Sequence, residues 1–238
     1  MEMISIHLKA RIMSSKCTIS INQYADFIKA SEAKRKRIIR DQKKPNLFRV
    51  SYYQLAKARI RKTLTDNGSI QHIRDALDKL SERVPVTKKQ ISDKAVSIEA
   101  LEKFLRMKIP IVLKSNETTF LNVKDFKSEI DVNGLSIIVA PEIIFKTVVD
   151  GKEVLGGVKL HVSKSNVFDV EQQQVIASGI CKYLEFNVAV HNQVVLPEFC
   201  ISLDIFGNGF ITNSNAKKNI VGRYKQECLE ILKIWDAA

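Results

Sequence analysis

The segment Leu135–Lys164, LSIIVAPEIIFKTVVDGKEVLGGVKLHVSK, determines the fold expected for the second half of the chain. Two β-rich runs flank Asp150-Gly151, a pair that favours a tight turn, so the segment is predicted to form a hairpin. The first run carries Glu142 directly after a proline, and the second run carries Lys159. An acid and a lysine are therefore expected on neighbouring strands, within reach of each other.

Periodicity elsewhere predicts an α+β fold in which a helical N-terminal region precedes a mixed sheet. Asn133-Gly134 favours a second hairpin, because both residues of a type I′ turn need positive φ. The predicted helices are 22–40, 52–64 with Ser51 as its N-cap, a segment starting at Ser69, 97–107, 169–186 and 215–235. The predicted strands are 126–132, 135–145, 153–162, 199–206 and 210–212.

From Ser97 to Phe206 these elements follow the order helix, three strands, helix, strand. That order, with Glu142 and Lys159 on neighbouring central strands, resembles the core of the PD-(D/E)XK, or restriction-endonuclease-like, nucleases. The resemblance implies a mixed-sheet core with a C-terminal helix over residues 97–238, and it leaves residues 1–96 as a basic helical region.

The resemblance also implies which residues form a nuclease site. Such enzymes use two acids to hold a divalent metal, usually Mg²⁺, and a lysine near the attacking water. Glu142 is then the catalytic, metal-binding acid and Lys159 the catalytic lysine, while Gly157 occupies the place of the second acid. Because glycine has no side chain to ligate a metal, the sequence indicates a nuclease fold with a degenerate or altered site, and an active nuclease is the alternative.

Other polar side chains are candidates to replace the missing acid. Alternation along the strand places some of them on the face of Gly157, and others begin the following helix. These candidates are Lys159, His161, Ser163, Glu171, Gln173 and Gln174. The alternative is that Glu142 is a surface acid and Lys159 a solvated residue, neither with a catalytic role.

From about residue 20 to its C-terminus the chain also resembles an uncharacterised family of bacterial proteins. The resembling segments are Tyr24–Phe27, Ile39–Lys43, Tyr52–Ala56, Gly157–Lys164 and Cys228–Trp235. The resemblance covers nearly the whole chain and implies that the pattern GVKLHVSK is a shared feature. It brings no activity with it.

Positive charge is concentrated in one part of the chain. The protein carries 38 lysines and arginines against 26 acids, a formal net charge of +12. The segment 34–62, called the basic block below, has Asp41 as its one acid and contributes almost all of the excess. Its basic residues are Lys34, Arg35, Lys36, Arg37, Arg40, Lys43, Lys44, Arg49, Lys57, Arg59, Arg61 and Lys62.

Such a block is typical of proteins that bind nucleic acid. We therefore expect DNA or RNA to bind here, mainly through its phosphates and with a salt-sensitive affinity. Phe48, Tyr52 and Tyr53 lie in the block and are candidates either for stacking on bases or for the core. The alternatives are an acidic protein partner and a pair of solvated helices.

The sequence offers little support for other functional classes. No apolar run reaches the roughly 20 residues needed to span a bilayer, and residues 1–13 lack the apolar core of a secretory signal. The four cysteines are scattered, and Cys181 and Cys228 fall in apolar helical patterns typical of buried thiols. No nucleotide-binding or nucleophile-elbow motif occurs. We expect a cytoplasmic protein that requires no cofactor, except Mg²⁺ if the nuclease site is active.

Overall fold

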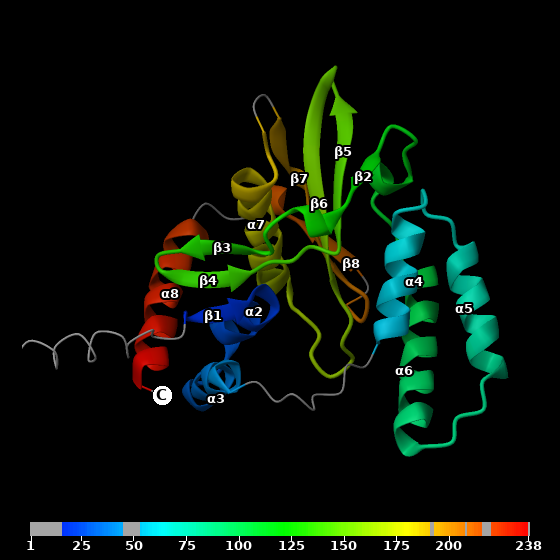
Figure 1. The fold of residues 1–238 in the computed structure, drawn as a ribbon, viewed down its shortest axis with the longest axis horizontal. Helices are drawn as coiled ribbons and strands as arrows, with labels where there is room; N and C mark the ends of the chain where they lie inside the picture. Colours follow the sequence, from blue (N-terminus) through cyan, green and yellow to red (C-terminus); the bar gives the residue numbers. More distant parts are fainter. Residues whose placement is uncertain (1–15, 45–52, 191–192, 208, 216–219, 238) are drawn as a thin grey trace, which may run out of the picture.

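The computed structural model describes residues 16–44, 53–190, 193–207, 209–215 and 220–237. It confirms the α+β class: a five-stranded mixed sheet forms the centre, with helices on both faces (Figure 1). Strands β6 and β7 are parallel, and the other neighbouring strands are antiparallel. In spatial order the strands are β2 (Thr119–Leu121), β5 (Ile143–Val149), β6 (Lys152–His161), β7 (Val194–Asp204) and β8 (Gly209–Thr212).

The hairpin of β5 and β6 has the turn that the sequence predicts. Asp150 and Gly151 have φ values of 50° and 73°, the left-handed values that a type I′ turn requires. The strands pair from Val149↔Lys152 to Ile143↔Val158. One residue further along this register, Glu142 stands opposite Lys159.

The run 135–145 is not the single strand that the sequence predicts. It divides into β4 (Leu135–Ile138) and β5, which belong to different sheets. The break has a local cause, because Ala140 adopts a left-handed φ of 40° and Pro141 has no N–H to donate to a ladder. Glu142 therefore lies where the chain enters the central sheet.

Strand β4 belongs to a second, three-stranded sheet in the order β1-β4-β3. Strand β1 (Thr18–Ser20) pairs with β4 in parallel, and β3 (Glu129–Val132) pairs antiparallel across the predicted turn at Asn133-Gly134. The predicted strand 126–132 therefore lies outside the central sheet. Its expected place is taken by β2, whose three residues are too few to give an alternating pattern.

The predicted helix 22–40 is also divided. Its first part, α2 (Ile21–Lys29), begins after Ser20, whose side chain accepts a hydrogen bond from the N–H of Gln23. Ala30 and Ser31 are extended, and α3 (Glu32–Lys43) begins after them. The first hundred residues are therefore not all-helical, since β1 precedes these two helices.

Three further helices form a layer on the other face of the central sheet: α4 (Gln54–Leu64), α5 (Gln71–Glu82) and α6 (Lys88–Leu105). Helix α4 ends where the sequence predicts but begins later, at Gln54, because Tyr53 adopts a left-handed φ of 67° and is the N-cap residue. The predicted N-cap Ser51 lies outside the described residues. Helix α6 begins well before the predicted Ser97, because Thr87 and Gln90 form a capping box. The positions 96 and 97 lie inside this helix.

The last two helices agree with prediction in type and place. Helix α7 (Val170–Asn187) connects the parallel strands β6 and β7, and α8 (Ile220–Ala237) ends the described chain. All four cysteines are buried free thiols, as the patterns around Cys181 and Cys228 predict. In the described ranges, no helix combines the length and the apolarity that crossing a bilayer requires.

Apolar side chains pack on both faces of the central sheet. Alternation along β5 sends Ile144 to one face and Phe145 to the other. The core with Ile144 includes α2, α3, α7, α8 and the three-stranded sheet, and the core with Phe145 includes α4, α5 and α6. The helical N-terminal region is therefore shared between the two cores (Figure 1).

Candidate functional site

Glu142 extends the pairing of β5 and β6 beyond the first residue of β5. Its N–H donates to the Val158 carbonyl at 2.9 Å, and its Oε2 accepts from the Leu160 N–H at 2.7 Å. The carboxylate thus satisfies a strand N–H that the backbone of β5 does not reach. With 19% of its side chain exposed, Glu142 has a structural role on β6.

Two lysine side chains converge on the other carboxylate oxygen. The Nζ atoms of Lys159 and Lys57 lie 3.5 Å and 3.7 Å from Glu142 Oε1. Lys159 also donates to the Ala140 carbonyl at 2.6 Å, and only 12% of its side chain is exposed. It is therefore not a solvated residue. The sequence anticipates the pairing of Glu142 with Lys159, but it gives no sign that Lys57 reaches them from α4.

Burial lowers the pKa of Lys159 below its ordinary value of 10.5; Glu142 opposes this shift and Lys57 reinforces it. As the pH rises through the lowered pKa of the folded state toward the ordinary pKa of the unfolded state, Lys159 binds its proton less in the folded chain than in the unfolded chain. The contribution of Lys159 to the free energy of unfolding therefore rises with pH in this range. The stability advantage of the wild type over Lys159→Met should therefore grow as the pH rises. Urea denaturation at several pH values between about 8 and 10 measures this difference.

The exposed Lys152 on the same strand provides the control, because Lys152→Met removes a lysine charge from β6 without disturbing the buried cluster. A difference between the wild type and Lys159→Met that stays constant over this pH range would contradict the shift.

The surroundings of Gly157 are tight for any side chain. A Cβ there would lie 3.0 Å from Ile180 Cγ2 on α7 and 3.4 Å from the carbonyl oxygen of Ile143. Leu184 also lies within contact distance, and both Ile180 and Leu184 are fully buried. A side chain at this position would enter the apolar interface with α7.

Three of the candidates to replace the missing acid, His161, Glu171 and Gln173, have contacts of their own away from Glu142. His161 is buried and stacks on Phe168, with ring centroids 3.7 Å apart. Glu171 forms an ion pair with Lys29, and Gln173 donates to the Phe168 carbonyl. Among the described residues, no group of three or more His, Cys, Asp and Glu side chains is placed to hold a metal ion.

The charge around Glu142 does not fit Mg²⁺. This cation is bound through carboxylates and retained waters, whereas here a single carboxylate is engaged by a backbone N–H and faces two ammonium groups. The net charge of the three side chains is positive, so the cluster attracts an anion rather than a cation. Lys57, with 33% of its side chain exposed, is the most accessible of the three.

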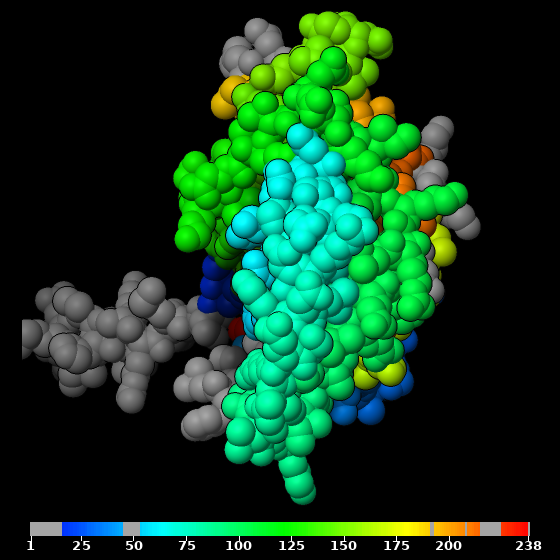
Figure 2. All heavy atoms as spheres, turned by 90° about the vertical axis from the view of Figure 1, so that its right-hand side faces the viewer, coloured from blue at the N-terminus to red at the C-terminus, as the bar shows by residue number. Residues whose placement is uncertain are grey.

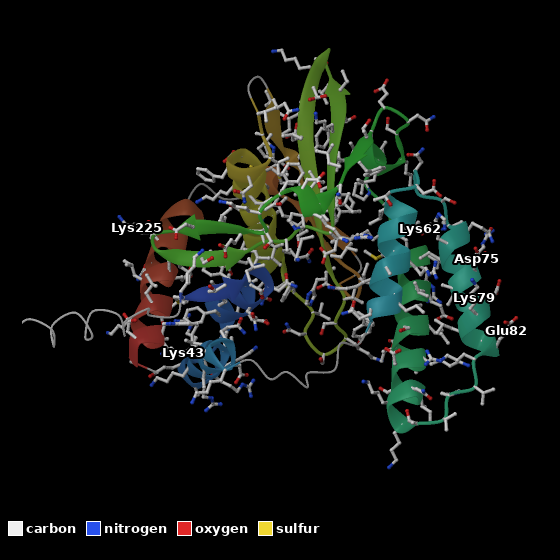
Figure 3. All side chains as sticks on the ribbon, viewed as in Figure 1. Lys43, Lys62, Asp75, Lys79, Glu82 and Lys225 are labelled. Atoms are coloured by element: carbon white, nitrogen blue, oxygen red, sulfur yellow. The ribbon has the colours of Figure 1, made fainter. Side chains whose placement is uncertain are left out.

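The structure divides the basic block between two distant helices. Figure 3 labels Lys43 on α3 and Lys62 on α4, on opposite sides of the central sheet. Helix α3 carries six of the basic residues and α4 carries four. Lys44 follows α3 directly, and Arg49 lies outside the described residues. The block is continuous in sequence but does not form one surface.

Arg35 on α3 has a structural role. Its NH1 donates to both carboxylate oxygens of Glu230 on α8, each at 2.8 Å. Its other donors reach the carbonyls of Phe27 and Ile28, and its guanidinium lies over the Phe27 ring. This bidentate geometry ties α3 to α8 and to the end of α2, so Arg35 has few donors left for a ligand.

A groove of about 1350 Å³ runs between α3 and the C-terminal part of α8. Lys34, Arg37 and Lys233 line it, are exposed, and form no ion pair or hydrogen bond within the described part of the chain. Other basic side chains of this surface have neighbours: Lys36 pairs with Glu32, and Arg40 lies 4.0 Å from Asp41. Lys233 is a groove residue that the basic block does not include.

A smaller hollow of about 480 Å³ lies on α4. Arg59, Arg61 and Lys62 line it, and none has a side-chain partner among the residues that the structure describes. In Figure 2 the helical layer that contains α4 faces the viewer. The neighbouring α5 instead mixes signs, with Asp75 and Glu82 beside its lysine (Figure 3). Helix α4 therefore carries cations without acids, whereas α5 carries both signs.

The aromatic residues of the basic block show no base-stacking surface among the described residues. Tyr53 packs edge-on against Phe206, with ring centroids 5.8 Å apart, and its hydroxyl accepts from the Lys164 N–H. It is thus partly buried against the core at the start of α4. Phe48 and Tyr52 lie outside the described residues.

No protein-family model matches the chain, and no curated protein is significantly similar to it.

Proposed function

We propose that the protein binds nucleic acid through its phosphate backbone, using the basic block on a nuclease-like core that does not cleave. The observation that carries the proposal is the groove between α3 and α8, where three exposed cations form no ion pair with the described residues, since the acids of the groove, Glu32 and Glu230, pair with Lys36 and Arg35. Clustered like charges repel one another, and a polyanion relieves that repulsion. Three cations along one open groove suit successive phosphates of a strand.

Contacts of this kind read the backbone and not the bases. Lysine is a flexible point charge that suits phosphates without fixing an orientation, and the described aromatic side chain of the block, Tyr53, is engaged in the core. We therefore propose binding with little sequence preference and with an affinity that falls steeply as salt increases.

The order of the elements supports the nuclease-like part of the proposal. Within the central sheet, helix α6, strands β2, β5 and β6, helix α7 and strand β7 follow the order helix, three strands, helix, strand, and the four strands are neighbours. Strands β3 and β4 lie between β2 and β5 in the chain but belong to the other sheet. Glu142 and Lys159 stand opposite each other on the central pair. The positive charge added by Lys57, together with the closed position at Gly157, favours a degenerate site over a working one.

Neutralising the groove should weaken nucleic-acid binding and reduce its salt dependence. The triple variant Lys34→Gln/Arg37→Gln/Lys233→Gln removes three phosphate contacts. Each contact contributes about 0.9 to the slope of log K against log salt, so the slope should fall by about 2 to 3 and the affinity by more than about tenfold. Fluorescence anisotropy with single- and double-stranded DNA and RNA at two salt concentrations measures both quantities.

The control is Lys88→Gln/Lys89→Gln/Lys124→Gln, which removes the same charge from exposed positions outside the basic block and should retain the slope. If both triple variants lost affinity and salt dependence equally, the effect would come from net charge and not from the groove. Absence of wild-type binding at low salt would overturn the proposal in favour of an acidic protein partner. Cleavage with Mg²⁺ that Glu142→Ala abolishes would instead identify an active nuclease.

A further inference from the structure

The two basic surfaces lie on opposite outer sides of the molecule. Helix α3 buries Ile38 and Ile39 in the core that also contains α2, α7 and α8. Helix α4 buries Ala56, Ile60 and Leu64 in the core on the other face of the central sheet. Because the buried stripe of a helix faces its core, the exposed cations face outward. The central sheet and both cores lie between the two surfaces (Figure 1).

We propose that these surfaces hold two separate nucleic-acid segments, so that one protein molecule bridges them. This inference rests on the proposed function, and it adds how many nucleic-acid segments one protein molecule binds and on which surfaces. Each surface has its own hollow and its own set of three cations without a partner in the described ranges. The sets are Lys34, Arg37 and Lys233 at the α3–α8 groove, and Arg59, Arg61 and Lys62 on α4.

A short duplex cannot serve both surfaces at once. The two surfaces belong to cores on opposite faces of the central sheet, so no straight path along the molecular surface joins them. A duplex of about ten base pairs is about 34 Å long and is far shorter than the persistence length of about 150 base pairs. It lies straight along one surface and does not curve around the intervening sheet to the other. The second surface remains available to another duplex.

The test mixes two pools of one short duplex of about ten base pairs, labelled with a donor or an acceptor fluorophore. At low salt the wild type should bind two duplexes per protein molecule and produce energy transfer between the pools. Calorimetric titration or analytical ultracentrifugation gives the stoichiometry. Two variants remove one surface each: Lys34→Gln/Arg37→Gln/Lys233→Gln and Arg59→Gln/Arg61→Gln/Lys62→Gln. Each should bind one duplex and produce no energy transfer.

Three results would overturn bridging while leaving nucleic-acid binding intact. The wild type could bind one duplex, the two variants could differ so that only one surface matters, or either variant could retain energy transfer. Retained transfer would place the second duplex on another copy of the protein, and ultracentrifugation of the complex would show that copy. If the wild type bound no duplex at low salt, the proposed nucleic-acid binding itself would be wrong. The experiment therefore distinguishes failure of bridging from failure of binding.

Discussion

The variant Gly157→Asp should lose most of its stability and should gain no nuclease activity. Its Cβ would meet Ile180 Cγ2 at 3.0 Å and the Ile143 carbonyl oxygen at 3.4 Å, and overpacking of this kind costs about 1–3 kcal/mol. The carboxylate would then lie among buried apolar side chains of α7, which costs several kcal/mol more or forces the group to stay protonated. The sum approaches the total of about 5–15 kcal/mol that stabilises a typical domain.

Urea denaturation followed by circular dichroism measures this loss, and Gly157→Ala is the matched control. Alanine adds the same Cβ without the charge, so it should cost only the steric part, about 1–3 kcal/mol. Soluble Gly157→Asp protein should be tested for cleavage of DNA with Mg²⁺. A Gly157→Asp variant as stable as the wild type that cleaves DNA would contradict this prediction, since it would show that the position accommodates an acid and that the site is restorable.

The variant Glu142→Gln should destabilise the protein by about 2–3 kcal/mol. Glutamine keeps the shape and an acceptor for the Leu160 N–H, but it removes the negative charge between Lys57 and Lys159. Removing one partner of a buried ion pair costs about 3–5 kcal/mol, because the remaining charge is left without compensation. Because Glu142 is partly exposed, the expected cost lies below this range.

A double-mutant cycle separates this charge effect from the loss of packing. Lys159→Met removes the buried ammonium, so the double variant Glu142→Gln/Lys159→Met should be more stable than the sum of the single losses implies, by about 1–2 kcal/mol. Midpoints and slopes of urea denaturation for the four proteins provide the comparison. Additive losses would mean that the cluster does not act as one electrostatic unit.

The sequence was sufficient where the structure depends on neighbouring residues. Asp150-Gly151 and Asn133-Gly134 form the predicted turns because their backbones adopt positive φ. Helices α4, α5, α7 and α8 follow apolar periodicity, which is a local pattern. The facing of Glu142 and Lys159 could also be anticipated, since the turn sets the register of the hairpin.

The sequence was insufficient where an element depends on distant partners. The break at Ala140 lies inside an unbroken apolar run, and it exists because β4 pairs with β1 and β3 while β5 pairs with β2 and β6. Strand β2 has three residues and is a strand because it pairs with β5. The closed surroundings of Gly157 come from α7, whose packing no local pattern records.

Taken by itself, the sequence determined the composition of the candidate site and of the basic block: a glycine where an acid is expected, and an excess of cations between residues 34 and 62. The tertiary structure alone decided how these charges are placed. In the folded protein Lys57 lies beside Glu142 and Lys159. The cations of α3 and those of α4 lie on different sides of the central sheet. The physical reason is that each helix buries its own apolar stripe, and the stripes of α3 and α4 pack in cores on different faces of the sheet. The charged side of each helix therefore faces solvent on its own side of the molecule.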